Sequence, residues 1–313
     1  MELQALREQA DAMAFVMSGK GDTLKTLRER DVIKHQIAKG YSVYANAARQ
    51  FWNWGMQDET IHSMLRDKIA GYDSFESDGH CEQLYFFTLS QIPRDNDKPR
   101  RVLEVGCGAG GGLNFLSRIE SGSEFVGVDL AETAIEHANA RFARSGMLTY
   151  KYGDAENLPF ADGEFDAVIN VESSHNYPSF ETFMREVARV LKPGGYFSLV
   201  DIFTTPRCAE FKRLVATDSN GLNWLHERDI SDPVKAAIRK RMQPGSSFRR
   251  NLRRVWRIPL CYVAVPIMLR AYGAYFVSQG NALTRRLRFH RRNGFRSVAG
   301  VTSYRHALAI KPR

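Results

Sequence analysis

The sequence of 313 residues is longer than most compact domains but typical of an α/β domain that carries insertions. Its 43% hydrophobic and 25% charged residues exclude a disordered or fibrous chain. The four cysteines lie far apart without a CxxC pair, so we expect reduced thiols in a cytoplasmic setting, with neither a disulfide framework nor a zinc site. The charged N-terminus and the short length of the longest nearly apolar run, 258–269, predict no secretory signal and no membrane span.

The net charge of +9 is distributed unevenly along the chain. Residues 1–232 contain 25 Lys and Arg and all 35 acidic residues, whereas residues 233–313 contain 19 Lys and Arg and no acid. This asymmetry indicates an anionic partner, such as a membrane surface, an acidic substrate, an acidic carrier protein or nucleic acid. The alternative is that the basic part packs against the acidic part of the same chain.

The first third of the chain is predicted to be helical. Apolar residues recur at spacings of three and four over 2–18, which indicates an amphipathic helix. A second helix is expected after Gly21–Asp22, which offers an N-cap. An aromatic segment over 41–55 follows, and the polar, proline-containing stretch 91–101 marks a boundary. We therefore expect residues 1–98 to form a helical cap or lid.

From residue 101 onward, apolar runs alternate with helical patterns. We expect strands at 101–108, 124–129, 148–154, 165–173, 196–203, 223–230 and 304–310, and helices ending near 119 and spanning 131–146 and 180–195. Such alternation predicts an α/β, Rossmann-like, seven-stranded and mostly parallel sheet with helices on both faces. Its core would span 99–243, a helical basic and apolar insertion 244–302, and the last core strand 303–313. Ligands should bind at the carboxyl ends of the strands.

A glycine-rich loop follows the first of these strands, in the string EVGCGAGG. Glycines let the backbone turn sharply and let a cofactor approach it closely. The loop also satisfies GxGxxG, the pattern of dinucleotide sites. Asp129 ends the second strand, where a carboxylate can accept hydrogen bonds from ribose hydroxyls. These features alone do not separate NAD from other adenosine cofactors.

Further sequence motifs distinguish between these adenosine cofactors. GDAENLPF at 153–160 is followed by Asp162 and Phe165-Asp166, and LKPGG stands at 191–195. With EVGCGAGGG and GVDL, this ordered set resembles the class I S-adenosylmethionine-dependent methyltransferases over roughly residues 100–205. Within the family, the strings are similar to the phthiotriol/phenolphthiotriol dimycocerosate methyltransferases and to small-molecule O-methyltransferases that act on sugars or polyketides.

The resemblance implies an S-adenosylmethionine site. The loop glycines would wrap the methionine part of the cofactor, and Glu104 would organise the loop and face the cofactor's amino end. Asp129 would bind the ribose, and Asp154 would accept from the exocyclic amine of adenine. The residues implied for the cofactor are Glu104, Gly106, Cys107, Gly108, Gly110, Asp129, Leu130, Asp154, Ala155 and Asn170. The alternative for each is a turn glycine or a solvated acid.

His175 follows the fourth strand, and the resemblance implies that it lies near the acceptor with Asp201 from the fifth strand. An alcohol or phenol stays largely protonated near neutrality, so a base within hydrogen-bond reach assists methyl transfer. Imidazole suits that task, and a carboxylate can orient it. The alternative is that His175 only hydrogen-bonds within its loop and alignment alone drives transfer. Asn176 stands where some sugar enzymes have a second histidine, so a paired-histidine mechanism is not implied.

Three further residues are expected near the acceptor: Glu172, Tyr177 and Trp54. Trp54 belongs to the string FWNWG, which resembles the aromatic-glycine segment before the core in sterol and related lipid methyltransferases. Tyr41 and Tyr44 are expected to close over the cofactor. The alternative is that these aromatic residues pack a helical cap against the sheet.

We therefore predict a cytoplasmic, S-adenosylmethionine-dependent methyltransferase without a metal site, which methylates a hydroxyl of an apolar or anionic, lipidic or polyketide-like small molecule. The insertion over 244–302 mixes arginine clusters with apolar and aromatic residues, which suits peripheral contact with an anionic membrane or packing against the protein. One alternative is carbon methylation of a quinone, sterol or polyprenoid. Another is nucleic-acid methylation, which the basic third favours. The string NVES opposes it, because base-amine methylating enzymes have Asn/Asp-Pro-Pro-aromatic there.

Overall fold

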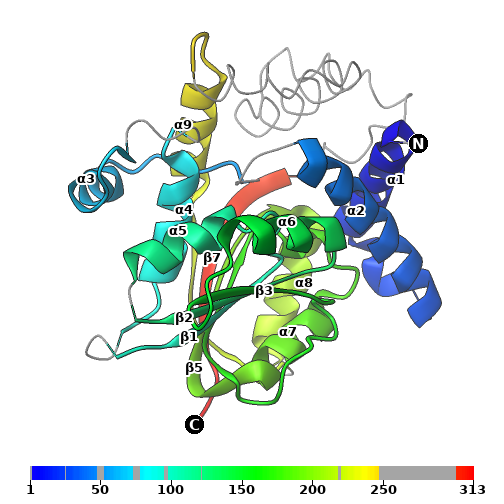
Figure 1. Cartoon of the computed structure of the whole chain (residues 1–313). Coiled ribbons are helices and arrows are strands. Elements are labelled where there is room, and N and C mark those ends of the chain that lie inside the picture. Colours follow the sequence, from blue (N-terminus) through cyan, green and yellow to red (C-terminus); the bar gives the residue numbers. More distant parts are fainter. Residues whose placement is uncertain are drawn as a thin grey trace.

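The computed structural model describes residues 2–24, 26–47, 53–72, 78–94, 98–120, 122–217, 220–246 and 301–313. They form a seven-stranded sheet in the order β3-β2-β1-β4-β5-β7-β6 (Figure 1). The strands are β1 (Arg101–Val105), β2 (Glu124–Asp129), β3 (Leu148–Tyr152), β4 (Phe165–Val171), β5 (Leu191–Thr204), β6 (Asn223–Asp229) and β7 (Val301–Ile310). β7 runs antiparallel to β5 and β6, and the other paired strands are parallel. The predicted Rossmann-like, mostly parallel sheet is confirmed.

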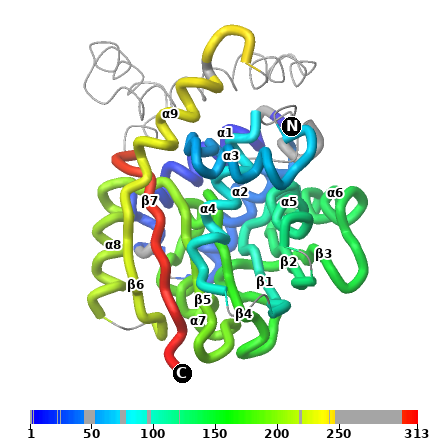
Figure 2. The backbone as a smooth tube through the Cα atoms, turned by 90° about the vertical axis from the view of Figure 1, so that its left-hand side faces the viewer, coloured from blue at the N-terminus to red at the C-terminus, as the bar shows by residue number. Residues whose placement is uncertain are grey.

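Helices cover both faces of the sheet. One buried core contains side chains of α4 (His80–Ser90), α5 (Gly111–Ile119), α6 (Glu132–Phe142) and α9 (Ser231–Met242). The other contains side chains of α7 (Phe180–Val190) and α8 (Thr205–Ala216). Successive strand residues point to opposite faces, so Val102 belongs to the first core and Leu103 to the second. In Figure 2, α8 lies beside β6 at one side of the sheet, and α5 and α6 lie at the other side, near β2 and β3.

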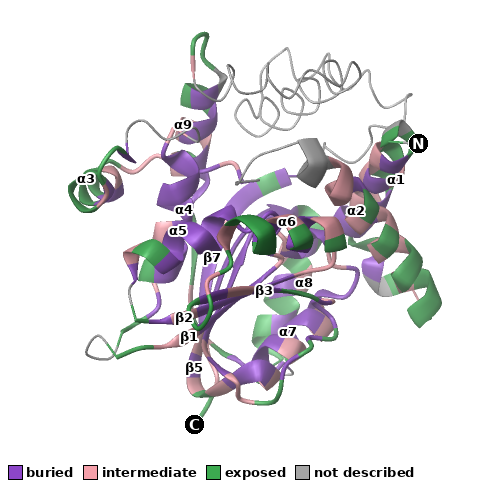
Figure 3. Cartoon of the chain, in the orientation of Figure 1, coloured by how far each residue is buried: buried purple, intermediate pink, exposed green. Residues whose placement is uncertain are grey.

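The N-terminal part contributes α1 (Glu2–Phe15), α2 (Leu27–Ala47) and α3 (Glu59–Lys68), with short helical turns over Val16–Lys20 and Gly21–Thr23. α1 packs against α2, and α2 packs against α6 of the core. Strands β1, β2, β4, β5 and β7 are buried over most of their length, whereas the edge strand β6, α3 and the outer faces of α1 and α2 are largely exposed (Figure 3). Within the described part of the chain, no helix is long and apolar enough to cross a membrane.

Several predicted boundaries are wrong. The first helix ends at Phe15 rather than residue 18. The second is capped by Thr26 rather than Asp22, because Thr26 Oγ1 accepts from Glu29 N and Glu29 Oε2 accepts from Thr26 N, a capping box. The helix that follows the second strand, α6, ends at Phe142 rather than at residue 146. The last strand begins at Val301 rather than at residue 304.

The largest error concerns residues 191–195, which were expected to end a helix. They begin β5, and α7 ends at Val190. The physical reason is Pro193, since the ring of a proline disfavours helical backbone at the residue before it. The expected insertion over 244–302 lies outside the described residues from 247 to 300.

Candidate active site

The glycine-rich loop joins β1 to α5 at the carboxyl edge of the sheet. Gly106, Gly108 and Gly110 have φ values of 76°, 51° and 80°, which side chains with a Cβ rarely adopt. A Cβ on Gly106 would also lie 1.8 Å from Ser173 Oγ. The backbone N–H groups of Gly106 and Cys107 both donate to Val128 O on β2, at 2.8 and 3.1 Å. The loop is therefore held against the neighbouring strand, with its inner surface open.

Asp129 at the end of β2 fixes the other side of the loop. Its Oδ2 accepts from Gly108 N at 2.8 Å, and its Oδ1 accepts from Ala131 N at 2.8 Å. Burial raises the pKa of the Asp129 carboxyl, while these backbone donors act in the opposite direction. Each carboxylate oxygen retains a further lone pair for a ligand hydroxyl.

Two adjoining cavities lie over this edge of the sheet. Cavity A, of about 530 Å³, is lined by Leu130, Asp154, Ala155, Glu156, Tyr177 and Lys34, among others. Cavity B, of about 480 Å³, is lined by Cys107, Gly108, Ala109, Asn53, Tyr85 and Glu172, among others. Both are lined by Tyr41, Gly106, Asp129, Ser173 and Asn176. The two cavities therefore meet at Asp129.

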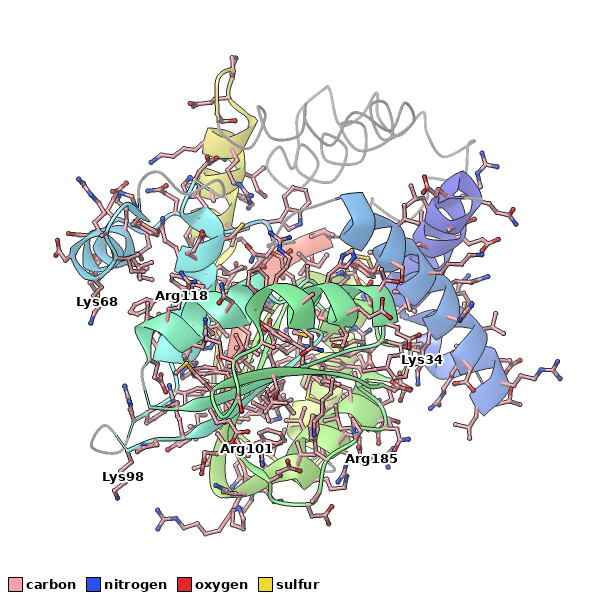
Figure 4. All side chains as sticks on the ribbon, viewed as in Figure 1. Lys34, Lys68, Lys98, Arg101, Arg118 and Arg185 are labelled. Carbon is pink, nitrogen blue, oxygen red and sulfur yellow. The ribbon has the colours of Figure 1, made fainter. Side chains whose placement is uncertain are left out.

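Helix α2 forms a wall of both cavities. Lys34 Nζ lies 2.7 Å from Asp154 Oδ2 and 2.8 Å from Glu156 Oε2, and Figure 4 shows Lys34 where α2 passes the core. Burial lowers the pKa of Lys34, but the two acids outweigh burial and raise the pKa overall. About two helical turns further on, Tyr41 Oη accepts from Asn176 Nδ2 at 3.0 Å. Two contacts about two turns apart thus hold α2 against the strand ends.

Sequence reasoning expected Tyr41 near the cofactor but missed Lys34 and Asn53. Tyr41 lines both cavities, whereas the side chain of Tyr44 lies outside the described residues. No local motif signals Lys34, because its partners stand 120 and more residues away in the chain.

Several predicted site residues lie behind the cavity walls. Asn170 is fully buried, and its Nδ2 donates to Val105 O at 2.8 Å, so it ties the ends of β4 and β1 together. Gly110 accepts from Tyr150 Oη at 2.7 Å through its carbonyl oxygen. Neither residue lines cavity A or B, and neither does Trp54.

Glu104 is fully buried beneath the loop. Tyr85 Oη donates to its Oε1 at 2.7 Å, while its Oε2 has no hydrogen-bond partner among the described residues. Burial raises the pKa of Glu104 to about 8. A cationic group of a bound ligand would offset the cost of burying the ionised Glu104 carboxylate.

His175 and Asp201 form a hydrogen-bonded pair at the ends of β4 and β5. His175 Nδ1 lies 2.7 Å from Asp201 Oδ1, and Asp201 Oδ2 accepts from His175 N at 2.9 Å and from Ser174 Oγ at 2.5 Å. Asp201 is fully buried, and His175 is 7% exposed. Ser173 and Asn176, which flank Ser174 and His175 in the sequence, line both cavities. His175 itself lines neither.

Glu172 stands in an unusual backbone conformation at the end of β4. Its φ of 51° is rare outside glycine, and such outliers persist where surrounding contacts enforce them. Trp54 N donates to Glu172 Oε1 at 2.6 Å, and Tyr304 Oη of β7 donates to the same oxygen. Burial raises the pKa of Glu172 to about 8. Glu172 therefore joins the N-terminal segment, β4 and β7 at cavity B.

The residues present fit an S-adenosylmethionine molecule. Cavity A offers carboxylates at Asp129 and Asp154 for ribose hydroxyls and an amine, and cavity B offers the glycine loop. Buried polar atoms without a partner among the described residues belong to Asn53 and Asn176, which line cavity B, and to Glu104, whose partner Tyr85 lines it. Native proteins rarely leave such atoms unpaired, so they indicate a polar ligand there.

Comparisons with known proteins agree with this geometry. Residues 103–199 match the family model described as a methyltransferase domain. The chain is 41% identical to a fatty-acid O-methyltransferase of Mycolicibacterium smegmatis over 192 residues, which cover 61% of this chain and just under two thirds (66%) of that protein. It is 37% identical to a phthiotriol/phenolphthiotriol dimycocerosates methyltransferase of Mycobacterium tuberculosis over 205 residues, which cover 65% of this chain and 69% of that protein.

Solved structures show the same fold. The [4+2]-cyclase SpnF has a TM-score of 0.58 at 16% identity, and the alignment covers 89% of this chain and 96% of that one. The geranyl diphosphate C-methyltransferase of Streptomyces coelicolor has a TM-score of 0.56 at 17% identity, with 89% and 97% covered. At such identities the likeness concerns the fold alone. The sequence relatives and the domain match show the family: this chain belongs to the S-adenosylmethionine-dependent methyltransferases.

Proposed function

We propose that this enzyme methylates a hydroxyl group of a lipidic or polyketide-like small molecule, with His175 as the base. The observation that carries the proposal is the 2.7 Å contact between His175 Nδ1 and Asp201 Oδ1. This pairing at the ends of β4 and β5 is the arrangement by which a carboxylate orients a general base. The relatives named for fatty-acid and phthiotriol methylation support a lipidic acceptor.

The proposal assigns a role to each of these residues. S-Adenosylmethionine, when bound, supplies an electrophilic methyl group. Asp201 accepts the Nδ1 proton of His175, which leaves Nε2 as the basic nitrogen. The acceptor hydroxyl gives its proton to Nε2, and its oxygen becomes free to form the new carbon–oxygen bond. Asp201 stabilises the positive charge that the imidazole gains.

The His175–Asp201 pair favours a hydroxyl acceptor over a carboxylate. An alcohol or phenol stays largely protonated near neutrality and therefore gains from a base, whereas a fatty-acid carboxylate is already ionised. A carboxylate needs no base, which would leave the His175–Asp201 pair without a role in proton transfer.

An acceptor panel tests this proposal. The protein is incubated with methyl-labelled S-adenosylmethionine and, separately, a long-chain alcohol, a long-chain phenol, a fatty acid, a polyprenyl quinone and RNA, and products are identified by mass spectrometry. We expect an ether from the alcohol or the phenol. Methyl esters alone, carbon-methylated quinone alone, or labelled RNA would contradict hydroxyl methylation and identify the competing acceptor.

We also propose that the segment 244–302 acts as a cap between the core, 99–243, and the last strand, and makes peripheral contact with anionic membrane. Its arginines and aromatic residues support this, since guanidinium groups bind anionic head groups while apolar side chains enter the interface. Flotation with vesicles containing an anionic lipid tests it at low and high salt. Absence of vesicle binding at low salt would contradict the proposed contact with anionic membrane.

A further inference from the structure

Asn53 carries an unexplained pair of polar atoms. The side chain is 8% exposed, and neither Oδ1 nor Nδ2 has a hydrogen-bond partner among the described residues. Leaving a buried amide unpaired costs roughly 1–3 kcal/mol per group, so native proteins seldom do so without a reason. Asn53 also lines cavity B, together with Cys107 and Gly108 of the glycine loop. The unpaired amide therefore borders the ligand site.

The backbone around Asn53 is fixed from several sides. Arg241 Nη1 donates to Asn53 O at 3.0 Å and to Trp54 O at 2.7 Å. Trp54 N donates to Glu172 Oε1 at 2.6 Å. Gly55 follows with a φ of 75°, and a Cβ there would lie 2.7 Å from His80 C. The amide is thus held at the cavity in advance of a ligand, which lowers the entropic cost of binding.

Cavity B lies at the end of the site remote from adenine. Leu130, Asp154 and Ala155 line cavity A only, and the cavities meet at Asp129, the expected ribose ligand. A cofactor that places its ribose at Asp129 and its adenine in cavity A extends its amino-acid end into cavity B. That end carries an α-ammonium and an α-carboxylate. Cavity B has acids and, among its described lining residues, no Lys or Arg. The α-carboxylate of the cofactor therefore needs neutral hydrogen-bond donors there.

We infer that the Asn53 side chain binds the amino-acid end of the cofactor, with Nδ2 donating to the carboxylate and Oδ1 accepting from the ammonium. An amide is suited to this zwitterion because it offers a donor and an acceptor at one position. Bonds to charged groups are also the stronger class of hydrogen bond. This inference rests on the cofactor, which family membership assigns, and is independent of which acceptor the enzyme methylates.

Two ligands that differ only at that end test the inference in the full-length protein. S-Adenosylhomocysteine has the amino-acid end, and 5′-methylthioadenosine lacks it. Calorimetric affinities are measured for wild type, Asn53→Ala and Asn53→Asp. We expect Asn53→Ala to weaken S-adenosylhomocysteine binding about 10- to 100-fold and 5′-methylthioadenosine binding less than about threefold. Asn53→Asp should weaken S-adenosylhomocysteine further, because its carboxylate repels that of the ligand.

Lys34→Met is the matched control, because Lys34 lines cavity A only and its loss should change both affinities by the same factor. Thermal unfolding midpoints are compared first, and Asn53→Ser replaces any variant that does not fold. Equal weakening of both ligands by the Asn53 variants, or no weakening, overturns the inference. If wild type binds neither ligand, the cofactor assignment fails with it, so the two failures are distinguishable.

Discussion

Replacing Glu104 by glutamine should abolish the proton release that accompanies cofactor binding. The carboxyl is fully buried, its Oε2 has no partner among the described residues, and burial raises its pKa to about 8. The cofactor's ammonium, which we propose that Glu104 faces, would favour the ionised carboxylate and lower that pKa towards the ordinary 4.5. Binding and ionisation are then linked.

The magnitude follows from the pKa of Glu104. At pH 7 a carboxyl with a pKa of about 8 is about nine-tenths protonated, so each bound cofactor should release about 0.9 proton. Affinity should rise by nearly tenfold per pH unit from about pH 5.5 to 7.5, between the bound and free pKa values. Glu104→Gln keeps the shape and the acceptor for Tyr85 but has no proton to release. It should bind the cofactor about 10- to 100-fold more weakly, since a charge-assisted bond is lost.

Titration calorimetry of S-adenosylhomocysteine in buffers of different ionisation enthalpy measures this proton directly. The wild type should show release that vanishes in Glu104→Gln. In the cofactor-free protein, the unfolded carboxyl ionises above about pH 4.5 while the folded one keeps its proton up to about pH 8. Stability should therefore fall as pH rises through that window, and less steeply in Glu104→Gln. Identical proton release by both proteins would refute the reasoning.

Three further substitutions test the cavity walls. Asp129→Ala removes the carboxylate where the cavities meet and should abolish detectable cofactor binding by calorimetry; unchanged affinity would refute its assigned role. Lys34→Met leaves Asp154 and the neighbouring acid without their cation, so α2 should be less firmly held and its hydrogen exchange faster, with little change in the sheet amides. Gly106→Ala adds a Cβ only 1.8 Å from Ser173 Oγ at a positive φ, so it should lower both the unfolding midpoint and cofactor affinity; wild-type values for both would contradict the geometry.

The features that sequence predicted well are local ones. Strand alternation, the glycine loop and the acid at the end of β2 each arise within a few residues, where backbone preferences and burial patterns dominate. The error at 191–195 also has a local cause, since Lys192 precedes Pro193 and cannot easily stay helical. The predicted helix over 180–195 includes Pro193, whereas α7 ends at Val190.

The features that sequence missed depend on tertiary packing. Lys34 meets Asp154 only because α2 packs on α6 and reaches the strand ends, and no pattern near either residue signals this. Asn53 gains significance only once its amide is seen to be buried and unpaired. Asn170, which is predicted at the cofactor, lines neither cavity and ties the end of β4 to β1. Side-chain direction at a strand end was beyond the sequence pattern.

The most direct test of the account is single-turnover methyl transfer by His175→Ala, with a hydroxyl acceptor identified by the panel and saturating S-adenosylmethionine. We predict a rate at least about 100-fold below wild type with unchanged cofactor affinity, because general-base catalysis contributes about 10²–10⁴-fold. His226→Ala, which changes a histidine of β6 that lines neither cavity, is the control and should keep most of the rate. A loss below about tenfold in His175→Ala, with the cofactor still bound, would contradict a base at this position.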